Sequence, residues 1–313
     1  MPNVHHLAKF IVPIVAVFNE DEVIPLGTGF IVGTMGNKAI IATATHNIEH
    51  AHEKDRPPPT HHRTTLPEFL PKTNGEYIWK NASLFALLTD GNGTTVNASI
   101  DRCWFDKNRD VAFCGIGVND SLKVPSILPF DKKIRISSRG PEKGDSIVAI
   151  GFPNYIDLSH EFNFKKSPHT IFSFDIEMKI NEGKVLEVHD IKGPGNHRWP
   201  CFQVDCPLLS GMSGGPILIE RDNELIACGI VSSDLQLGEN KASGEHAFAS
   251  IMWTSSYIKT DLFHTDTDTG NVAKLNNILD FMKIGIIEDL DNAGEHVEII
   301  YNDQGIPSDL VWK

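Results

Sequence analysis

The sequence predicts an all-β fold made of two six-stranded antiparallel barrels. Short runs of apolar or β-branched residues recur along the chain, each bounded by Gly, Asn, Asp or Pro, as is typical of β-strands. No long amphipathic helical pattern interrupts them, which indicates an all-β class. A polar stretch divides the runs into two equal sets, and each set of six strands is expected to close into a barrel.

The expected strands account for most of the chain up to residue 253. The first set consists of Phe10–Phe18, Gly27–Val32, Ala39–Thr45, Leu84–Thr89, Val111–Ile116 and Ser146–Phe152. The second set consists of Thr170–Ile180, Lys184–Ile191, Cys201–Cys206, Pro216–Ile219, Leu225–Ser232 and Ala247–Trp253. Residues 154–169 would connect the two sets.

Other segments interrupt or follow these strands. Residues 47–80 contain Pro57-Pro58-Pro59 and paired histidines, as is typical of a surface insertion. Beyond the barrels, Ser255–Phe263 and Lys274–Ile287 have helical spacing, and His296–Tyr301 has that of a last strand. We therefore expect an N-terminal lobe over residues 1–153 with the insertion, a C-terminal lobe over residues 154–263, and a small helical or mixed extension over residues 264–313.

Composition indicates a soluble folded protein and excludes some partner classes. Hydrophobic residues make up 41% and charged residues 22% of the 313 residues, close to the globular average. The formal net charge of −13 repels a phosphate backbone, so nucleic acid is not an expected partner. The apolar run Phe10–Phe18 is about half a membrane span long. Acidic residues follow it, so it is interpreted as a first strand rather than a signal peptide, and no membrane partner is expected.

Cysteine usage predicts a reducing compartment. Cys103, Cys114, Cys201, Cys206 and Cys228 are an odd number and have neither disulfide-framework nor metal-site spacing. We therefore expect free thiols and a cytoplasmic location, with no bound metal and no cofactor.

The segment Gly211–Pro216 is the most informative part of the sequence. A serine flanked by glycines between two strands lies where the backbone can turn sharply. Its Oγ is then exposed, and successive N–H groups point into one small space that can hold an oxyanion. A glycine-rich hairpin turn would have the same local sequence, so catalysis requires partners elsewhere.

Two further segments supply such partners. A serine hydroxyl needs an adjacent base, and the base needs an acid that fixes its tautomer. His46 ends the run Ala42–Thr45, and Asp110 begins the run Asp110–Phe113. Both lie at strand ends, where functional groups gather on a rigid scaffold. His46, Asp110 and Ser213 are therefore the candidate base, acid and nucleophile.

At these segments the chain resembles the chymotrypsin-like serine peptidases, and within them the bacterial high-temperature-requirement type more than the digestive enzymes. The order His46, Asp110, Ser213 and the distances between them in the sequence are those of the family. Gly27–Val32 and Ile147–Pro153 resemble other recurring strands of the family, as does Ala247-Phe248-Ala249. The resemblance covers about residues 8–260 and leaves out the insertion, the connector and the extension.

The resemblance implies a chymotrypsin-like serine endopeptidase that acts on protein or peptide substrates through an acyl-enzyme. It makes Ser213 the nucleophile, His46 the general base and Asp110 the orienting acid. It also assigns the oxyanion hole to the backbone N–H groups of Gly211 and Ser213. Losing one such donor typically costs about 2.7–4 kcal/mol of transition-state stabilisation.

Two departures from the family pattern concern activation and location. Met212 stands where digestive enzymes have an aspartate that pairs with a newly cut N-terminus, so activation by N-terminal cleavage is not expected. The cysteines that bracket the catalytic histidine in secreted relatives are absent, and Asn47 follows His46 directly, which again indicates a reducing compartment. We expect a chain that is active as made or held latent until a partner corrects the oxyanion loop. The extension is the candidate regulatory contact, with a structural cap over one barrel as the alternative.

The resemblance also implies a substrate specificity pocket. Its expected lining residues are Pro207, Leu208, Val231, Ser232, His246 and Phe248. Cation-preferring relatives have a carboxylate where this chain has Pro207, and glutamate-preferring relatives have a histidine where it has Val231, so neither preference is expected. A mainly apolar pocket should favour small or medium aliphatic side chains. His246 either faces the pocket and admits a polar or acidic side chain, or is hydrogen-bonded to neighbouring backbone, and Asp234 is expected at the rim.

Two other interpretations remain open. The segment His46-Asn47-Ile48-Glu49-His50 matches the H-x-x-E-H zinc peptidase signature, which requires both histidines on one helix. His46 ends a β-rich run, and this context speaks against the signature. Alternatively, the barrels form a latent or non-catalytic binding module, although all three triad members are present.

Overall fold

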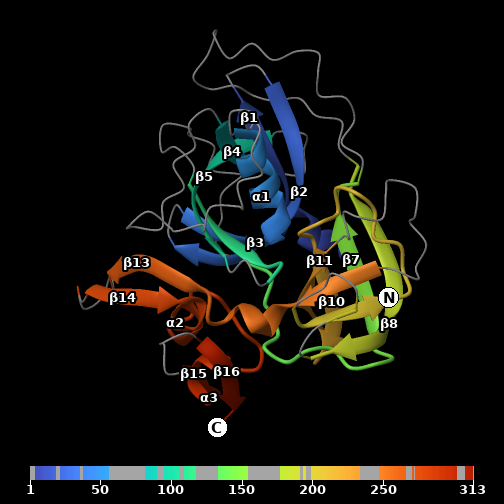
Figure 1. The fold of residues 1–313 in the computed structure, drawn as a ribbon, viewed down its shortest axis with the longest axis vertical. Helices are drawn as coiled ribbons and strands as arrows, with labels where there is room; N and C mark the ends of the chain where they lie inside the picture. The colour runs from blue at the N-terminus through green and yellow to red at the C-terminus, as the bar shows by residue number, and fades with distance from the viewer. Residues whose placement is uncertain are drawn as a thin grey trace, which may run out of the picture.

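The computed structural model contains two closed antiparallel barrels and a C-terminal extension (Figure 1). The structure describes residues 4–18, 22–35, 38–55, 82–89, 95–105, 109–117, 133–153, 177–190, 193–194, 199–232, 247–265, 270, 272–301 and 307–312. In Figure 1 the first barrel is blue to teal, and the extension is orange to red. The two six-stranded barrels confirm the predicted chymotrypsin-like fold class.

The first barrel contains six strands in the order β1-β2-β3-β6-β5-β4. Their bounds are β1 Ile11–Phe18, β2 Glu22–Met35, β3 Lys38–Thr43, β4 Ala82–Thr89, β5 Thr95–Phe105 and β6 Ala112–Gly117. Strand β1 is buried along its whole length. The short 3₁₀ helix Val4–Phe10 and strand β7 of the second barrel pack against it. This run therefore forms a first strand, as the sequence predicted.

The second barrel also contains six strands, in the order β10-β11-β12-β9-β8-β7. Their bounds are β7 Ser146–Gly151, β8 Lys179–His189, β9 Cys201–Val204, β10 Pro216–Arg221, β11 Glu224–Ser232 and β12 Ala247–Ile251. Strands β10, β11 and β12 are almost completely buried, whereas β8 consists of exposed and half-buried residues apart from the buried Val185.

The count of twelve barrel strands was correct, but three errors lie behind it: β7 was placed in the wrong set, β8 was divided in two, and β5 was missed. The expected strand Ser146–Phe152 was placed in the first set, yet β7 pairs with β8 and β10 of the second barrel. It therefore falls on the other side of the expected lobe boundary at residue 153. The expected strands Thr170–Ile180 and Lys184–Ile191 were separated at a polar Asn-Glu-Gly segment, but β8 runs through this segment because β7 pairs with it there. Residues 170–176 lie outside the described part.

Strand β5 was not predicted at all. From Val96 to Ile100 its side chains alternate between buried and more exposed positions, and a register shift follows between Ile100 and Arg102. The predicted strands were continuous apolar runs, whereas β5 has the period-two pattern of a strand with one exposed face.

A short helix follows β3, where the sequence predicted a longer strand. The expected strand Ala39–Thr45 ends at Thr43, and helix α1 spans Thr45–Asp55. His46 therefore lies in the first turn of α1 rather than at the end of a strand. Residues 56–80 of the expected insertion lie outside the described residues.

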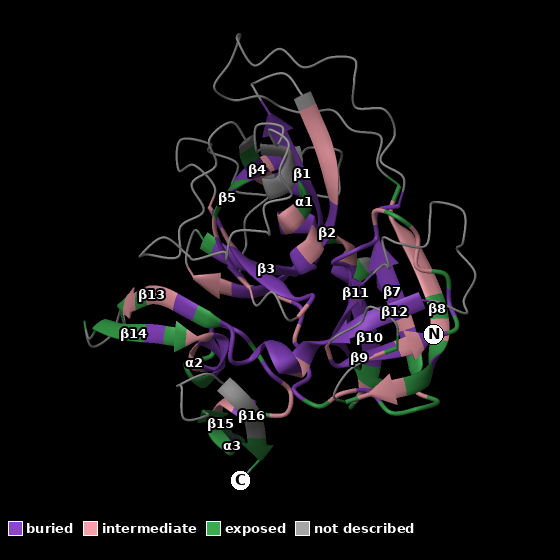
Figure 2. Ribbon diagram, in the orientation of Figure 1, coloured by how far each residue is buried: buried purple, intermediate pink, exposed green. Residues whose placement is uncertain are grey.

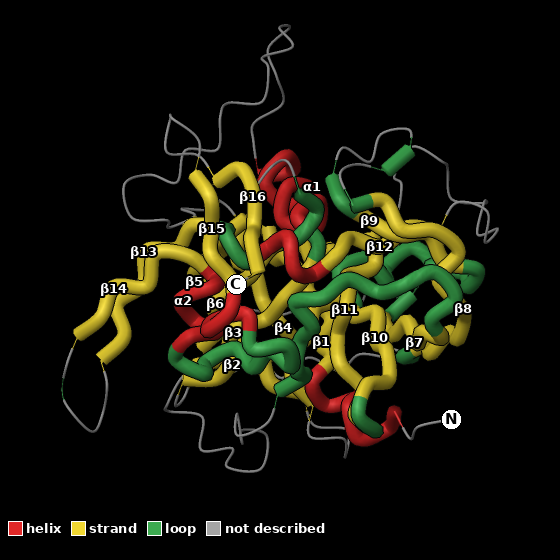
Figure 3. Tube along the Cα trace, turned by 90° about the horizontal axis from the view of Figure 1, so that it is seen from below, coloured by secondary structure: helices red, strands yellow, loops and turns green. Residues whose placement is uncertain are grey.

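The chain that follows the second barrel, from Met252 onward, is a mixed assembly of two hairpins and short helices, and we call this whole region the extension. Its elements are the 3₁₀ helix η4 Met252–Ser255, β13 Lys259–Thr265, β14 Val272–Asn277, α2 Ile278–Lys283, α3 Ala293–His296, β15 Val297–Tyr301 and β16 Pro307–Trp312. Strands β13 and β14 form one hairpin, and β15 and β16 form the other. Seen from below, the β13–β14 hairpin projects from the rest of the molecule (Figure 3).

The helical predictions for this region were largely wrong. Only Ser255 of Ser255–Phe263 belongs to a 3₁₀ helix, and most of this range is strand β13, while Lys274–Ile287 is α-helical only over α2. Helix α2 begins at residue 278 because the Asn277 side chain accepts a hydrogen bond from the Asp280 N–H and caps the helix. The prediction of a strand over His296–Tyr301 is confirmed by β15.

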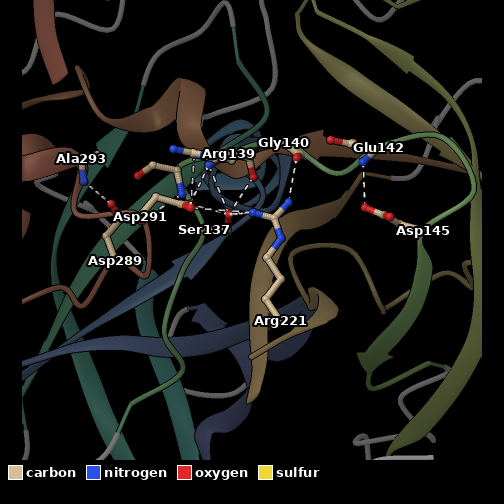
Figure 4. Close-up of polar contacts among 10 residues, drawn as sticks. Ser137, Arg139, Gly140, Glu142, Asp145, Arg221, Asp289, Asp291 and Ala293 are labelled. Atoms are coloured by element: carbon tan, nitrogen blue, oxygen red, sulfur yellow. Dashed lines mark hydrogen bonds and ion pairs between the residues drawn. The ribbon is translucent and has the colours of Figure 1, made fainter. Parts of the chain in front are cut away.

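The extension is bound to the segment that runs between the barrels, residues 133–140. The Asp289 carboxylate accepts hydrogen bonds from the N–H groups of Ser138 and Ala293. Asp291 accepts one from the Ser137 hydroxyl at 2.7 Å, and Arg221 of β10 donates to the same hydroxyl (Figure 4). These bonds connect the extension, the inter-barrel segment and the second barrel.

Apolar packing joins the extension to the first barrel as well. Phe281 of α2 is fully buried, and its ring centroid lies 5.9 Å from that of Trp104 in β5. Leu275, Ile278 and Ile287 belong to the same hydrophobic cluster as the interior of the first barrel. Figure 2 shows where buried residues, in purple, lie along the strands of the two barrels. The extension is thus part of the folded core. Within the described ranges, no helix has the length and apolar character needed to span a bilayer.

Candidate active site

His46 and Asp110 meet at one end of the first barrel. Strand β3 ends at Thr43 and carries the chain directly into α1, so His46 is held in the first helical turn. The Thr45 hydroxyl donates to the Arg109 carbonyl at 2.9 Å, which ties the start of α1 to the residue before Asp110. These contacts bring the start of α1 next to the segment that carries Asp110, although the two are far apart in the sequence.

The His46 ring is aligned with the Asp110 carboxylate. Its Nδ1 lies 2.9 Å from both Oδ1 and Oδ2, and the backbone N–H of His46 donates to Oδ1 at 3.1 Å. Asp110 is only 5% exposed, so these contacts are made with little competition from water. A carboxylate in this position keeps the proton of the neutral ring on Nδ1.

A second polar side chain, that of Ser232, also contacts Asp110. The Ser232 hydroxyl at the end of β11 donates a short hydrogen bond to Asp110 Oδ2. The sequence assigned Ser232 only to the substrate pocket, and the structure adds this contact across the barrel interface. Sequence spacing gave no signal for it, because 122 positions separate the two residues.

The two ionisable groups shift each other's pKa in opposite directions. Burial alone lowers the pKa of His46, but the charge of Asp110, the hydrogen bond to it and the charge of Glu49 outweigh burial and raise the pKa above its usual value. Burial alone raises the pKa of Asp110, but the charge and hydrogen bonds of His46 and the bond from Ser232 outweigh it and lower that pKa. The pair therefore stabilises the charged form of each group relative to its neutral form.

Ser213 lies on a tight loop of the second barrel that leads into β10. The loop needs both following glycines: a Cβ at Gly214 would overlap with the Thr28 carbonyl, and one at Gly215 would overlap with the Ile150 carbonyl. Gly214 also has φ of 87°, a left-handed conformation that favours glycine. The Gly-Gly pair thus lets the loop approach the first barrel closely.

Most backbone N–H groups of this loop are hydrogen-bonded within the protein, but that of Gly211 is available to bind an anion. The N–H groups of Met212, Gly214 and Gly215 donate to the carbonyls of Leu209, Val231 and Met212, respectively. The Gly211 N–H, at φ of 90°, has no acceptor among the described residues. It is one of the two expected oxyanion donors.

The structure brings the Ser213 loop against the His46 helix without a hydrogen bond from His46 Nε2. The Ser213 carbonyl accepts from the side chain of Asn47, the residue after His46, at 2.9 Å. His46 Nε2 is buried and has no hydrogen-bond partner within the part of the chain that the structure describes. Such catalytic contacts are often long without substrate and tighten when it binds.

The expected specificity pocket is only partly described. Pro207 is exposed and its carbonyl accepts from Asn181, while Leu208 is half-buried and packs against the core of the second barrel. Val231 lies within that core, and the Phe248 ring is 6.4 Å from the His189 ring. His246 and Asp234 lie outside the described residues. The pocket assignment stays a prediction.

Met212 has a different environment from the aspartate of the digestive enzymes. Its side chain is fully buried, belongs to the core of the second barrel and accepts a contact from Asn181 at 3.6 Å. The side chain fixes the loop through apolar packing rather than through an ion pair. The absence of activation by N-terminal cleavage stays a prediction.

The helix required by the zinc signature is present, contrary to the expectation. Helix α1 carries both His46 and His50, and the His50 side chain is exposed. The His46 Nδ1, however, faces Asp110. Across the described ranges, no three His, Cys, Asp or Glu side chains lie close enough together to hold a metal ion.

Comparisons with known proteins were made for the whole chain. A family model described as a trypsin-like peptidase domain matches residues 27–227. The solved structure of Deg5 is 17% identical, with a TM-score of 0.48, and the match covers 80% of this chain and 88% of that one. The HtrA-type protease AlgW with decapeptide is 14% identical, with a TM-score of 0.47 and coverage of 98% and 86%. Protease Anisep from Arthrobacter nicotinovorans is 16% identical, with a TM-score of 0.44 and coverage of 78% and 90%. No curated protein matches the sequence.

Proposed function

The chain belongs to the family of trypsin-like peptidase domains, whose model matches residues 27–227, and on this premise we propose that it cleaves peptide bonds through an acyl-enzyme formed on Ser213. It is a serine endopeptidase. The proposal concerns how its residues carry out the reaction.

In the first step, His46 acts as general base toward Ser213. The Ser213 Oγ forms a bond to the scissile carbonyl carbon while its proton passes to His46 Nε2. Nε2 can accept this proton because Asp110 holds the other ring proton on Nδ1, 2.9 Å from the carboxylate. The imidazolium that forms is stabilised by the adjacent negative charge.

The tetrahedral intermediate then breaks down to products. Its oxyanion is bound by the N–H groups of Gly211 and Ser213, and the leaving amine takes the proton from His46 Nε2 as the C–N bond breaks. Water attacks the resulting ester with His46 again as base, which releases the acid product and restores the Ser213 hydroxyl. Every proton is returned, so no cofactor is needed.

The observation that carries this proposal is the state of the His46 ring. Nδ1 contacts both oxygens of a buried carboxylate, while Nε2 has no hydrogen-bond partner among the described residues. A histidine with one nitrogen fixed and the other available is the arrangement that a general base requires.

Active-site labelling tests the proposal. A fluorophosphonate should attach to Ser213 of the wild-type protein, as read by peptide mass mapping, and should not label Ser213→Ala. A chelator should leave labelling and peptide hydrolysis unchanged. Hydrolysis that a chelator abolishes would favour the zinc peptidase alternative, and a protein that neither hydrolyses peptides nor reacts would favour the binding module.

We also propose an apolar preference for the residue before the cut. Leu208, Val231 and Phe248 are the apolar side chains of the expected pocket, and no carboxylate stands at Pro207. A peptide library should show cleavage mainly after Val, Leu, Ile or Ala. Cleavage mainly after Lys or Arg would contradict the pocket assignment. Cleavage after Glu or Gln that disappears in His246→Ala would make His246 the specificity residue.

We also propose a cellular location for the protein, a reducing compartment. All five cysteines are free and buried, and burial raises the pKa of Cys201 and Cys228 to about 12. Thiols of this kind fit a reducing compartment such as the cytoplasm. A partner that acts on the oxyanion loop through the extension stays a prediction.

A further inference from the structure

Two carbonyl oxygens of the Ser213 loop are held by donors from the first barrel. The Gly211 carbonyl accepts a hydrogen bond from the Thr28 hydroxyl at 2.8 Å. The Ser213 carbonyl accepts from the Thr28 N–H at 2.8 Å and from Asn47 Nδ2 at 2.9 Å. Thr28 lies in β2 and Asn47 in α1, so all three bonds cross the boundary between the barrels.

The donors are themselves fixed by a closed network. The Phe152 N–H donates to Thr28 Oγ1 at 3.0 Å, so Thr28 Oγ1 accepts there and its single proton goes to the Gly211 carbonyl. Thr43 Oγ1 donates to the Thr28 carbonyl at 2.7 Å and accepts from Asn47 Nδ2 at 3.1 Å. Each hydroxyl therefore has one orientation.

Burial makes this network costly to break. Thr28 and Thr43 are fully buried, and Asn47 is 1% exposed. Gly27 leaves the space that the Asn47 side chain occupies, because a Cβ at Gly27 would overlap with the Asn47 amide. A buried amide or hydroxyl that loses its partner has no water to replace it, so the contacts are maintained in the folded state.

The geometry of the peptide chain links this network to catalysis. A peptide group is planar, so the Ser213 N–H is fixed by the plane that joins Met212 to Ser213. That plane lies between two peptide groups whose carbonyls, those of Gly211 and Ser213, are bound by the first barrel. Gly211 and Gly214 on either side are both at positive φ and gain no rigidity from a side chain. The bonds from the first barrel therefore add to the constraints from Met212 packing and from the Gly214 N–H bond to the Val231 carbonyl.

We propose that Thr28 and Asn47 are positioning residues that keep the oxyanion-binding loop in its catalytic conformation by holding its two carbonyl oxygens. They act through the Gly211 and Ser213 backbone and touch no reacting atom. The inference rests on the proposed function, since it assigns these N–H groups to the oxyanion. Its consequence is that the first barrel supplies the shape of the oxyanion hole as well as the general base.

The first test replaces each donor by an apolar side chain of similar size. Thr28→Val and Asn47→Leu should each lower kcat by at least about tenfold, because displaced oxyanion donors cost up to about 10²–10³ in kcat. KM should stay within about twofold, since substrate binding is not altered. Thr28→Ser keeps the hydroxyl and should restore most of kcat.

A matched control separates this effect from the general loss of a buried hydroxyl. Thr260 of β13 is also buried and donates to a carbonyl, that of Leu275, at 2.7 Å. Thr260→Val removes the same type of bond in the extension and should leave kcat unchanged. A fall in kcat for Thr260→Val equal to that of Thr28→Val would overturn the proposal.

A second readout does not depend on activity. Amide hydrogen exchange of residues 211–215 should be faster in Thr28→Val and Asn47→Leu than in wild type and Thr28→Ser, while the barrel strands exchange as before. If wild type fails to react with the fluorophosphonate, the proposed function is wrong and exchange still decides the positioning role. If wild type reacts but both apolar variants keep wild-type kcat and exchange, the positioning role is wrong and the function stands. Should Thr28→Val fail to fold, Asn47→Leu decides between these outcomes.

Discussion

The two halves of the active site are held together by different kinds of interaction. In the first barrel, His46 and Asp110 are positioned by side-chain hydrogen bonds and opposite charges. In the second barrel, Ser213 is positioned by the backbone of a glycine loop and by bonds to its carbonyls. Changes of charge and pH should therefore act on the first half, and changes of backbone shape on the second.

The largest loss of kcat is expected when the negative charge of Asp110 in the first half of the site is removed. Asp110→Asn should lower kcat by about 10⁴, because the ring can then hold its proton on the wrong nitrogen. The wild-type kcat/KM should rise with pH through a pKa above the ordinary value of about 6.5, because the charge of Asp110 raises the pKa of His46. In the variant this charge is absent, so the rise should move to lower pH. A pH profile that Asp110→Asn leaves in place would contradict the electrostatic account.

A change of backbone shape should act on the second half with a somewhat smaller effect. In Gly214→Ala the new Cβ would overlap with the Thr28 carbonyl and Thr43 Oγ1, so the loop must move and kcat should fall by about 10²–10³. Gly285→Ala is the matched control: Gly285 also has positive φ, but no atom lies within 4 Å of its added Cβ. It should cost about 1–3 kcal/mol of folding free energy and leave kcat unchanged. Equal kinetic losses in the two variants would contradict the proposed role of loop shape.

Ser232 connects the two halves, so its removal should have an intermediate effect. Ser232→Ala removes one hydrogen bond to Asp110, and kcat should fall about tenfold. The folded-state pKa of Asp110 is lowered, so this carboxylate adds stability above its unfolded pKa of about 3.9 that is lost as the pH falls through the folded pKa. Without the Ser232 bond the folded pKa rises, and acid unfolding should begin at higher pH. Unchanged acid unfolding, measured by circular dichroism, would show that the bond contributes little.

The smallest kinetic effect is expected in the extension, which stabilises the fold and contributes no group to the reaction. Asp289→Ala removes the acceptor for the N–H groups of Ser138 and Ala293 and should lower the free energy of unfolding by about 1–3 kcal/mol. The kcat of the folded enzyme should not change. A large loss of kcat without a loss of stability would instead support the regulatory role of the extension.

The fold class and the three candidate residues could be predicted because they depend on local patterns. Apolar runs mark strands, and His46, Asp110 and Ser213 each lie in a recognisable segment. Strand β5 was missed because only one of its faces is consistently apolar. Strand β7 was placed in the wrong set, because no sequence pattern shows which neighbours a buried strand will pair with.

The contacts that hold the site could not be predicted because they join distant parts of the chain. Thr28 and Gly211 are 183 positions apart, and Asn47 and Ser213 are 166 apart. Nothing in the local sequence of Thr28 or Asn47 indicates that a carbonyl of the other barrel will lie against it. Such roles become visible only when both barrels are in place.

The central claim is that the two halves act as one catalytic unit, and a double-mutant comparison tests it most directly. The kcat for one peptide substrate would be measured for His46→Ala, Ser213→Ala and the double variant, with thermal unfolding to show that each is folded. Groups that act together have strongly non-additive effects. The double variant should therefore be about as slow as the slower single variant. A loss in the double variant equal to the product of the two single losses would contradict the claim.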